Sequence, residues 1–273
     1  MIELVDVRLD HPRGGSPPLV TNANLGVPGG QVVVIVGAAG VGTSRIVAAA
    51  LGEVAVAEGR IEVLGRDVGK LRRSSLRLLR RRIGIVPQDL CLLEDRSAQL
   101  NVVMPLEIDG IPRSVSVARA AECLARMGLE DEASLPVDCL SSSARQRVTV
   151  ARALVRDPDL IIADHPTSAQ DAEGAERVCE AFYEAASRGK SVIVFSRDPA
   201  LRAIAERNHW RQLALLDGML VPLGEIELEG RSIEEVLVTI DSAPTPLHAL
   251  DDDEPAIPNL VPFPITARTA GAR

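Results

Sequence analysis

Short apolar runs alternate with helical patterns along most of the chain. Residues 32–36 are five consecutive apolar residues, a run short enough to be a buried strand. A glycine-spaced turn follows, and then an Ala-rich stretch from Thr43 that predicts a helix. Further strand patterns cover 2–9, 19–27, 60–64, 83–86, 159–164 and 191–195. Strands that alternate with helices predict an α/β fold with a mostly parallel sheet.

Helical periodicity predicts helices over 71–82, 171–188 and 199–207. Between residues 98 and 155 the helical pattern dominates, which indicates a helical insertion. Residues 71–82 are dense in arginine, but no aromatic residues interleave with them, so they predict a solvated helix face rather than a nucleic-acid patch.

The last part of the chain changes character. Asp217-Gly218 lies between two short apolar runs, 213–216 and 220–223, and predicts a β-hairpin. Ser232 and Glu235 have the spacing of a capping box that opens a short helix. Residues 241–273 combine prolines with an acidic cluster, so we expect a disordered tail after a domain that covers residues 1–240.

Composition narrows the possible classes. The net charge of the 273 residues is −8, which argues against a nucleic-acid partner. No uninterrupted apolar run reaches about 18 residues, so we expect no membrane-spanning helix. The amino-terminal pattern is that of a strand rather than a signal peptide. The four cysteines are scattered, which is typical of free thiols in a cytosolic protein.

The glycine-spaced turn has the context of a phosphate-binding loop. It comprises Gly37, Ala38, Ala39, Gly40, Val41, Gly42, Thr43 and Ser44. Its glycines allow successive backbone N–H groups to point inward, and the following helix adds partial positive charge. The motif requires lysine where this chain has Thr43, whereas Ser44 keeps the position of the Mg²⁺ ligand.

Six landmarks stand in one order along the chain. They are Gly37–Ser44, Ile83–Asp89, Leu140–Leu154, Leu160–Thr167, Ser168–Asp171 and Val194–Asp198. In this order they resemble the phosphate loop, Q-loop, signature segment, Mg²⁺-side strand, D-loop and histidine switch of an ABC-transporter nucleotide-binding domain. The sequence of residues 80–110 is most similar to the cell-division (FtsE-type), lipoprotein-release and MacB-type subfamily. The resemblance implies a P-loop NTPase core with an antiparallel β subdomain and a helical subdomain.

The resemblance also implies ATP and Mg²⁺ as ligands and assigns roles to single residues. The implied Mg²⁺ ligands are Ser44, Gln88 and Asp164. Catalytic positions fall to Gln88, to His165 in place of the carboxylate, and to Arg197 in place of the switch histidine. Further nucleotide contacts fall to the loop residues 37–44 with Arg45, to the signature serines Ser141, Ser142 and Ser143, and to Asp171 and His11. Each position also has a plain structural interpretation, such as a strand-end aspartate or a turn histidine.

The departures from the family pattern predict a degenerate pseudo-ATPase. Thr43 carries no charge, and Arg45 lies about 200° further around the helix, so we expect it to turn away from the phosphates. Serines at 142 and 143 replace the signature glycines and obstruct the backbone. Two alternatives stay open: an atypical ATPase that uses His165 as its base, and a cytosolic scaffold that only kept the fold.

The implied partners are a membrane permease subunit, a paralogous ATP-binding subunit, or both, in a dimer at the inner face of the cell membrane. Residues 90–93 (LCLL) follow the Q-loop, where the family has a groove for a helix of the membrane subunit. These apolar residues either receive such a helix or pack under the helical insertion.

Overall fold

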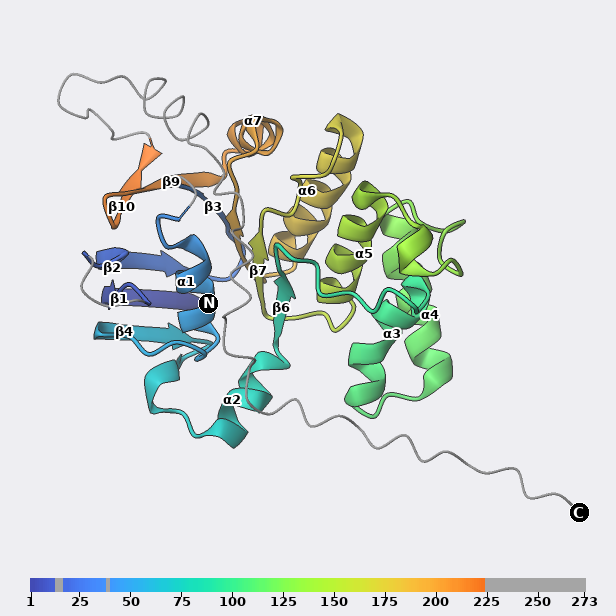
Figure 1. Ribbon diagram of the computed structural model, residues 1–273, viewed down its shortest axis with the longest axis horizontal. Coiled ribbons are helices and arrows are strands. Elements are labelled where there is room, and N and C mark those ends of the chain that lie inside the picture. Colours follow the sequence, from blue (N-terminus) through green and yellow to red (C-terminus); the bar gives the residue numbers. More distant parts are fainter. Residues whose placement is uncertain (13–16, 38–39, 224–273) are drawn as a thin grey trace, which may run out of the picture. The chain divides into compact units, whose positions relative to one another are not determined.

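Two β-sheets and a set of surrounding helices make up the described part of the chain (Figure 1). The structure is a computed structural model, and it describes residues 1–12, 17–37 and 40–223. The capping box at Ser232 and Glu235 and the predicted tail 241–273 lie outside the described residues.

The larger sheet has the strand order β10-β9-β3-β8-β7-β6. Its strands are β3 (Val32–Gly37), β6 (Ile83–Val86), β7 (Leu160–Asp164), β8 (Ser191–Phe195), β9 (Arg211–Leu216) and β10 (Met219–Pro222). All neighbours are parallel except β10, which pairs antiparallel with β9 through the predicted hairpin. The mostly parallel α/β fold is therefore confirmed.

Strand β3 is buried on both faces, which explains its continuous apolar sequence. Val32, Val34 and Val36 pack into the core formed with the helices. Val33 and Ile35 point to the other face, into a core shared with the second sheet and α1. Because side chains alternate along a strand, one run of β-branched residues supplies both cores.

The smaller sheet is antiparallel, with the order β2-β1-β4-β5. Its strands are β1 (Ile2–Leu9), β2 (Val20–Val27), β4 (Glu58–Val63) and β5 (Arg66–Asp67). In β1 the side chains of Ile2 and Leu4 are buried, and those of Glu3 and Val5 between and after them are more exposed. This alternation is expected for a strand with one face on the core.

The helices between β6 and β7 group together on the side away from the antiparallel sheet (Figure 1). They are α3 (Ala98–Ile108), α4 (Arg113–Arg126), η2 (Val137–Cys139) and α5 (Ser142–Leu154). This confirms the predicted helical insertion. The remaining helices are α1 (Thr43–Ala50), η1 (Val68–Lys70), α2 (Arg73–Arg80), α6 (Ala172–Ser187) and α7 (Pro199–Arg207).

Helix α2 is shorter than the predicted 71–82, and of its residues only Leu79 is buried. Its arginines form a solvated face, as predicted. The four cysteines are free thiols, and Cys179 is the buried one. Burial raises the pKa of the Cys179 thiol to about 12, so that thiol is protonated at neutral pH.

Candidate functional site

The phosphate loop joins the buried end of β3 to the first turn of α1. Gly40 and Gly42 have φ angles of 81° and 111°, which side chains with a Cβ atom rarely adopt. A Cβ atom on Gly42 would lie 3.0 Å from the Cβ atom of Leu19, just before β2. Glycine is thus needed where the loop passes the antiparallel sheet. Ala38 and Ala39 lie outside the described residues.

The rest of the loop has a packing role. A Cβ atom on Gly37 would lie 2.9 Å from the Cγ2 atom of Val41. Val41 in turn packs against the core that contains Ile35. Gly37 therefore makes room for the side chain that anchors the loop.

A cavity of about 330 Å³ opens at this loop. It is lined by Leu19, Gly40, Gly42, Thr43, Ser44 and Arg45. The first turn of α1 contributes unpaired backbone N–H groups and the positive end of the helix dipole, which together favour an anion. Thr43, at the position of the missing lysine, adds a half-buried neutral hydroxyl.

Arg45 lies in the first turn of α1, next to the loop. We expected its side chain to turn away from the phosphates, and Arg45 is among the residues that line the cavity with Thr43 and Ser44. Side chains of a helix lean toward its amino-terminal end, so a long side chain in the first turn can reach back to the loop. The Nε atom of Arg45 is buried and has no hydrogen-bond partner among the described residues.

Ser44 and Asp164 meet beside the cavity, although 120 residues separate them in the sequence. The Ser44 hydroxyl donates a hydrogen bond of 3.1 Å to Oδ2 of Asp164, at the end of β7. Oδ1 of Asp164 is buried without a hydrogen-bond partner in the described part of the chain. Burial raises the pKa of Asp164, while neighbouring His165 and the Ser44 hydrogen bond lower it.

This pair fits Mg²⁺. The ion is commonly held by one or two carboxylates together with water and the phosphates of a nucleotide. The unpaired Oδ1 of Asp164 and the Ser44 hydroxyl oxygen are two hard oxygen ligands of that kind. Within the described residues, no group of three or more His, Cys, Asp or Glu side chains forms a metal site by itself.

His165 follows β7 in a left-handed conformation, with φ at 50°. Its backbone N–H donates to the Phe195 carbonyl at 2.8 Å, which fixes the turn against β8. The Nε2 atom lies 3.9 Å from Oδ1 of Asp164. Burial lowers the pKa of His165 below its ordinary value, Asp164 raises it, and Arg197 lowers it again. The imidazole is therefore neutral at pH 7.

Arg197 is half-buried and lies close enough to act on the charge of His165. The next residue, Asp198, caps α7 by accepting from the Ala200 N–H at 2.9 Å. It also accepts a hydrogen bond from the Thr167 hydroxyl. The structure thus brings the predicted positions Asp164, His165 and Arg197 together at the carboxyl ends of β7 and β8.

Gln88 is exposed in the loop after β6. The adjacent Asp89 lies near enough to Asp164 to raise its pKa, so this loop borders the Ser44–Asp164 pair. The residues that follow are held tightly. Leu90 and Cys91 both have positive φ angles, and Arg152 of α5 donates to both of their carbonyl groups.

The signature serines begin helix α5. The Ser141 hydroxyl caps it by accepting from the Ala144 N–H at 3.1 Å. Ser142 is exposed, whereas the Ser143 hydroxyl donates to Oε1 of Gln170 at 3.1 Å. The Ser143 hydroxyl thus forms a hydrogen bond within this chain.

Two glutamines that the sequence reading missed connect the signature segment to His165. Gln170 donates through Nε2 to Oε1 of Gln146 at 3.0 Å. Gln146 is buried and donates to the His165 carbonyl at 2.9 Å and to the Ser168 hydroxyl at 3.0 Å. A polar residue on the inward face of a predicted helix is the signal that could have identified Gln146.

Asp171 and His11, which were predicted to contact the nucleotide, are not among the residues that line the phosphate cavity. Asp171 caps α6 by accepting from the Gly174 N–H at 2.8 Å, which is the plain structural interpretation of that residue. His11 lies just beyond β1 and does not line the phosphate cavity.

None of the helices in the described ranges is long and apolar enough to cross a membrane.

The profile of the ABC transporter family matches residues 20–168, more than half of the chain. The chain belongs to this family. The match runs from β2 through the phosphate loop and the signature helix to Ser168, and it thus covers the Ser44–Asp164 pair. The predicted ABC-transporter nucleotide-binding domain is confirmed.

Similar proteins and solved structures agree with this family assignment. The macrolide export ATP-binding/permease protein MacB of Escherichia coli K12 is 34% identical over 246 residues, which are 89% of this chain and 36% of MacB. The methionine import ATP-binding protein MetN of Mesorhizobium japonicum is 32% identical over 83% of this chain and 60% of its own length. The ABC chain thus spans about a third of MacB. The MacB match fits the predicted subfamily.

The dimeric structure of MJ0796, a bacterial ABC transporter cassette, superimposes with a TM-score of 0.74 at 30% identity. The alignment covers 81% of this chain and 96% of that cassette. A post-hydrolysis state of MJ0796 bound to ADP and phosphate gives a TM-score of 0.73 at 29% identity. The P-loop NTPase fold with its antiparallel and helical subdomains is therefore established for this ABC chain.

Proposed function

We propose that the chain is the ATP-binding subunit of a membrane transporter or an FtsE-type complex, and that it is a pseudo-ATPase. It binds Mg-ATP weakly and hydrolyses it at most very slowly. One observation carries the proposal. The phosphate cavity keeps its glycine loop and the Ser44–Asp164 pair, while Thr43 replaces the residue that would neutralise the phosphates.

Binding is proposed to depend on Arg45. Its guanidinium is the only charged group among the described residues that line the cavity. A guanidinium suits phosphate oxygens because it donates several hydrogen bonds in one plane. Ser44 and Asp164 hold Mg²⁺, which supplies further neutralisation of phosphate charge, and the other loop residues of 37–44 contribute backbone N–H groups. Gln88 lies at the edge of this site, and His11 is the proposed neighbour of the adenine base of ATP.

Hydrolysis is proposed to fail for lack of charge and positioning. Phosphoryl transfer depends almost wholly on these two effects, and one cationic stabiliser is worth about 10³–10⁵ in rate. Thr43 removes one cation, and the serines at 142 and 143 bring side chains to the segment that faces the partner's nucleotide in the family dimer. Ser143 is already bonded to Gln170.

An active ATPase is the second candidate, and the state of His165 favours it. A neutral imidazole can accept a proton from water, and burial keeps His165 neutral at pH 7. Arg197 then stands where the family has a histidine. The two candidates differ in one observable, which is phosphate release at neutral pH.

The proposed partners are a membrane permease subunit and a second ATP-binding subunit, at the inner face of the cell membrane. Leu93, in the loop after Gln88, is 47% exposed and is available to an apolar helix of a permease. Signature residues 141–143 and Asp171 are proposed to face the nucleotide of the second subunit. Residues 1–240 are the proposed ATP-binding domain, and 241–273 its acidic tail.

Calorimetry of Mg-ATP binding tests this function. We expect the wild-type chain to bind, and Arg45→Ala to weaken binding at least tenfold, since a hydrogen bond to a charged group contributes about 1.5–3 kcal/mol. Arg77→Ala is the matched control, because Arg77 is exposed on α2 and outside the cavity. Equal affinity in Arg45→Ala and Arg77→Ala contradicts the role of Arg45, and no binding by the wild type contradicts nucleotide binding itself.

A further inference from the structure

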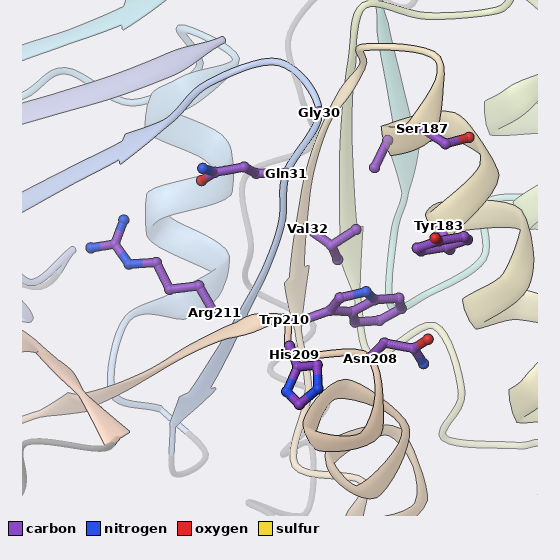
Figure 2. A pocket seen from close by; sticks show the side chains of 10 residues that line it. Gly30, Gln31, Val32, Tyr183, Ser187, Asn208, His209, Trp210 and Arg211 are labelled. Atoms are coloured by element: carbon purple, nitrogen blue, oxygen red, sulfur yellow. The ribbon is translucent and has the colours of Figure 1, made fainter.

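A second cavity, of about 410 Å³, lies at the other end of β3 from the phosphate loop (Figure 2). Val32, the first residue of β3, lines it, whereas Gly37 at the last position leads into the phosphate loop. Six residues of strand span about 20 Å, so the two cavities are separate. The volume lies in the range of small-molecule sites, about 300–1,000 Å³.

The cavity gathers the amphipathic aromatic residues of the chain. The 273 residues include one tryptophan and one tyrosine, and both Trp210 and Tyr183 line it. Tyr183 comes from α6 and Trp210 from the segment before β9, and Figure 2 shows both rings directed into the space beside Val32. Trp210 is 9% exposed and Tyr183 is 53% exposed. Such rings offer a large apolar contact area together with a polar atom.

The Nε1 atom of Trp210 is a buried hydrogen-bond donor without a partner among the described residues. Leaving such a group unpaired is costly, and an indole nitrogen can only donate. The nearby Asn208 donates through Nδ2 to the Ile204 carbonyl at 2.8 Å, and its acceptor Oδ1 makes no hydrogen bond to the indole. A ligand that supplies an acceptor to Trp210 would remove this cost.

Charge narrows the class of ligand further. The described residues that line this cavity include Arg211 and no aspartate or glutamate. The Arg211 side chain is directed away from Trp210 and Tyr183 (Figure 2) and donates to the Gly26 carbonyl at 3.1 Å, so its guanidinium takes no part in the site. A cationic ligand would find no carboxylate here, whereas a ligand with an acceptor oxygen suits the unpaired Trp210 N–H.

We propose that this cavity binds a planar aromatic carboxylate. Its ring packs between Tyr183 and Trp210, and a carboxylate oxygen accepts the Trp210 N–H. Because Tyr183 is half-exposed on α6, its side chain can turn aside to admit the ring, whereas Trp210 stays in the core. The site is independent of the proposed nucleotide function, and β3 connects the two cavities directly.

Benzoate is the probe, and Trp210 is its own reporter because the chain contains no other tryptophan. Titration of the full chain with benzoate is expected to change the Trp210 fluorescence saturably, with half-saturation at about 10 mM or below, as suits so small a ligand. Benzylammonium, which has the ring without the acceptor, and acetate, which has the acceptor without the ring, are expected to give no saturable change. A non-saturating response to benzoate, or an equal response to benzylammonium, overturns the proposal.

Variants locate the binding. Tyr183→Ala is expected to weaken benzoate binding about tenfold, whereas Tyr183→Phe, which keeps the ring, binds as the wild type does. Trp210→Phe keeps a ring but removes the N–H, and ligand-observed NMR is expected to show binding at least tenfold weaker. Wild-type affinity in both Tyr183→Ala and Trp210→Phe would place benzoate elsewhere and contradict the assignment.

Discussion

We propose that Arg45 and Thr43 divide the work that one lysine performs in a complete phosphate loop. Thr43 stands at the lysine position without a charge, and Arg45 brings a charge to the same cavity two residues later. A guanidinium held there can stabilise bound phosphate without occupying the place that the reaction requires. We therefore propose that nucleotide binding and hydrolysis are separable in this chain.

Thr43→Lys is expected to strengthen Mg-ATP binding by about tenfold or more, because it adds a charge-assisted contact to a loop whose glycines are intact. Hydrolysis is expected to need His165→Glu and Arg197→His in addition, and glycines at 142 and 143. Calorimetry measures the first effect. An unchanged dissociation constant would show that the loop cannot present a lysine to the phosphates.

His165 predicts a dependence of stability on pH. Burial lowers its pKa in the folded chain below the ordinary value near 6.5, so the unfolded chain binds the proton more readily. The folded state is therefore expected to lose stability as the pH falls below about 6.5. Melting temperatures at pH 7.5 and 5.5 are expected to differ more for the wild type than for His165→Gln. Equal shifts would contradict the buried neutral imidazole.

Helix α5 is coupled to the segment that follows β7 through Gln146. Its side chain also accepts from the Ala169 N–H at 3.1 Å, so one buried amide serves the signature helix and the segment after β7. Gln146→Ala is expected to lower the free energy of unfolding by about 3 kcal/mol, because several buried groups lose their partner. Urea unfolding measures this. The exposed Gln31→Ala is the control, and an equally small change in both variants would contradict the coupling.

The loop after the Q-loop separates two roles that the sequence left open. Leu92 packs against the core below the helical insertion, whereas Leu93 is exposed. Asn101 of α3 holds Leu93 by accepting from its N–H at 2.8 Å and donating to its carbonyl at 3.0 Å. One residue therefore belongs to the core, and its neighbour is presented on the surface.

Leu92→Glu is expected to destabilise the chain by about 2 kcal/mol, because it brings a charge against apolar side chains. Leu93→Glu is expected to change stability by no more than about 0.5 kcal/mol and to abolish association with a permease partner. Urea unfolding and co-purification with the membrane fraction check the two effects. Retention of the partner by a folded Leu93→Glu variant would contradict docking at this loop.

Elements with a strong local pattern could be predicted from the sequence, and long-range placements could not. The apolar run Val32–Val36 and the Pro199–Arg207 helix were found because burial on two faces and a proline at the first turn leave local signals. The Ser44–Asp164 contact was implied only by resemblance. The direction of the Arg45 side chain stays a prediction, because rotation about the helix axis does not include how far a long side chain can reach.

At the scale of the whole molecule, β3 carries a cavity at each end, and the two cavities differ in chemistry. The phosphate end offers backbone N–H groups and Arg45, whereas the other end offers Trp210 and Tyr183. The proposed binding of nucleotide without hydrolysis takes place at the phosphate end.

Phosphate release from ATP at neutral pH tests that account most directly. The purified chain with Mg²⁺ and Asp164→Ala, which removes the proposed metal ligand, are measured side by side after both are shown to be folded. We predict no difference between them and no release above background. Turnover near ~1 s⁻¹ that Asp164→Ala abolishes, a rate at the low end for ordinary enzymes, would contradict the account and establish an active ATPase with His165 as its candidate base.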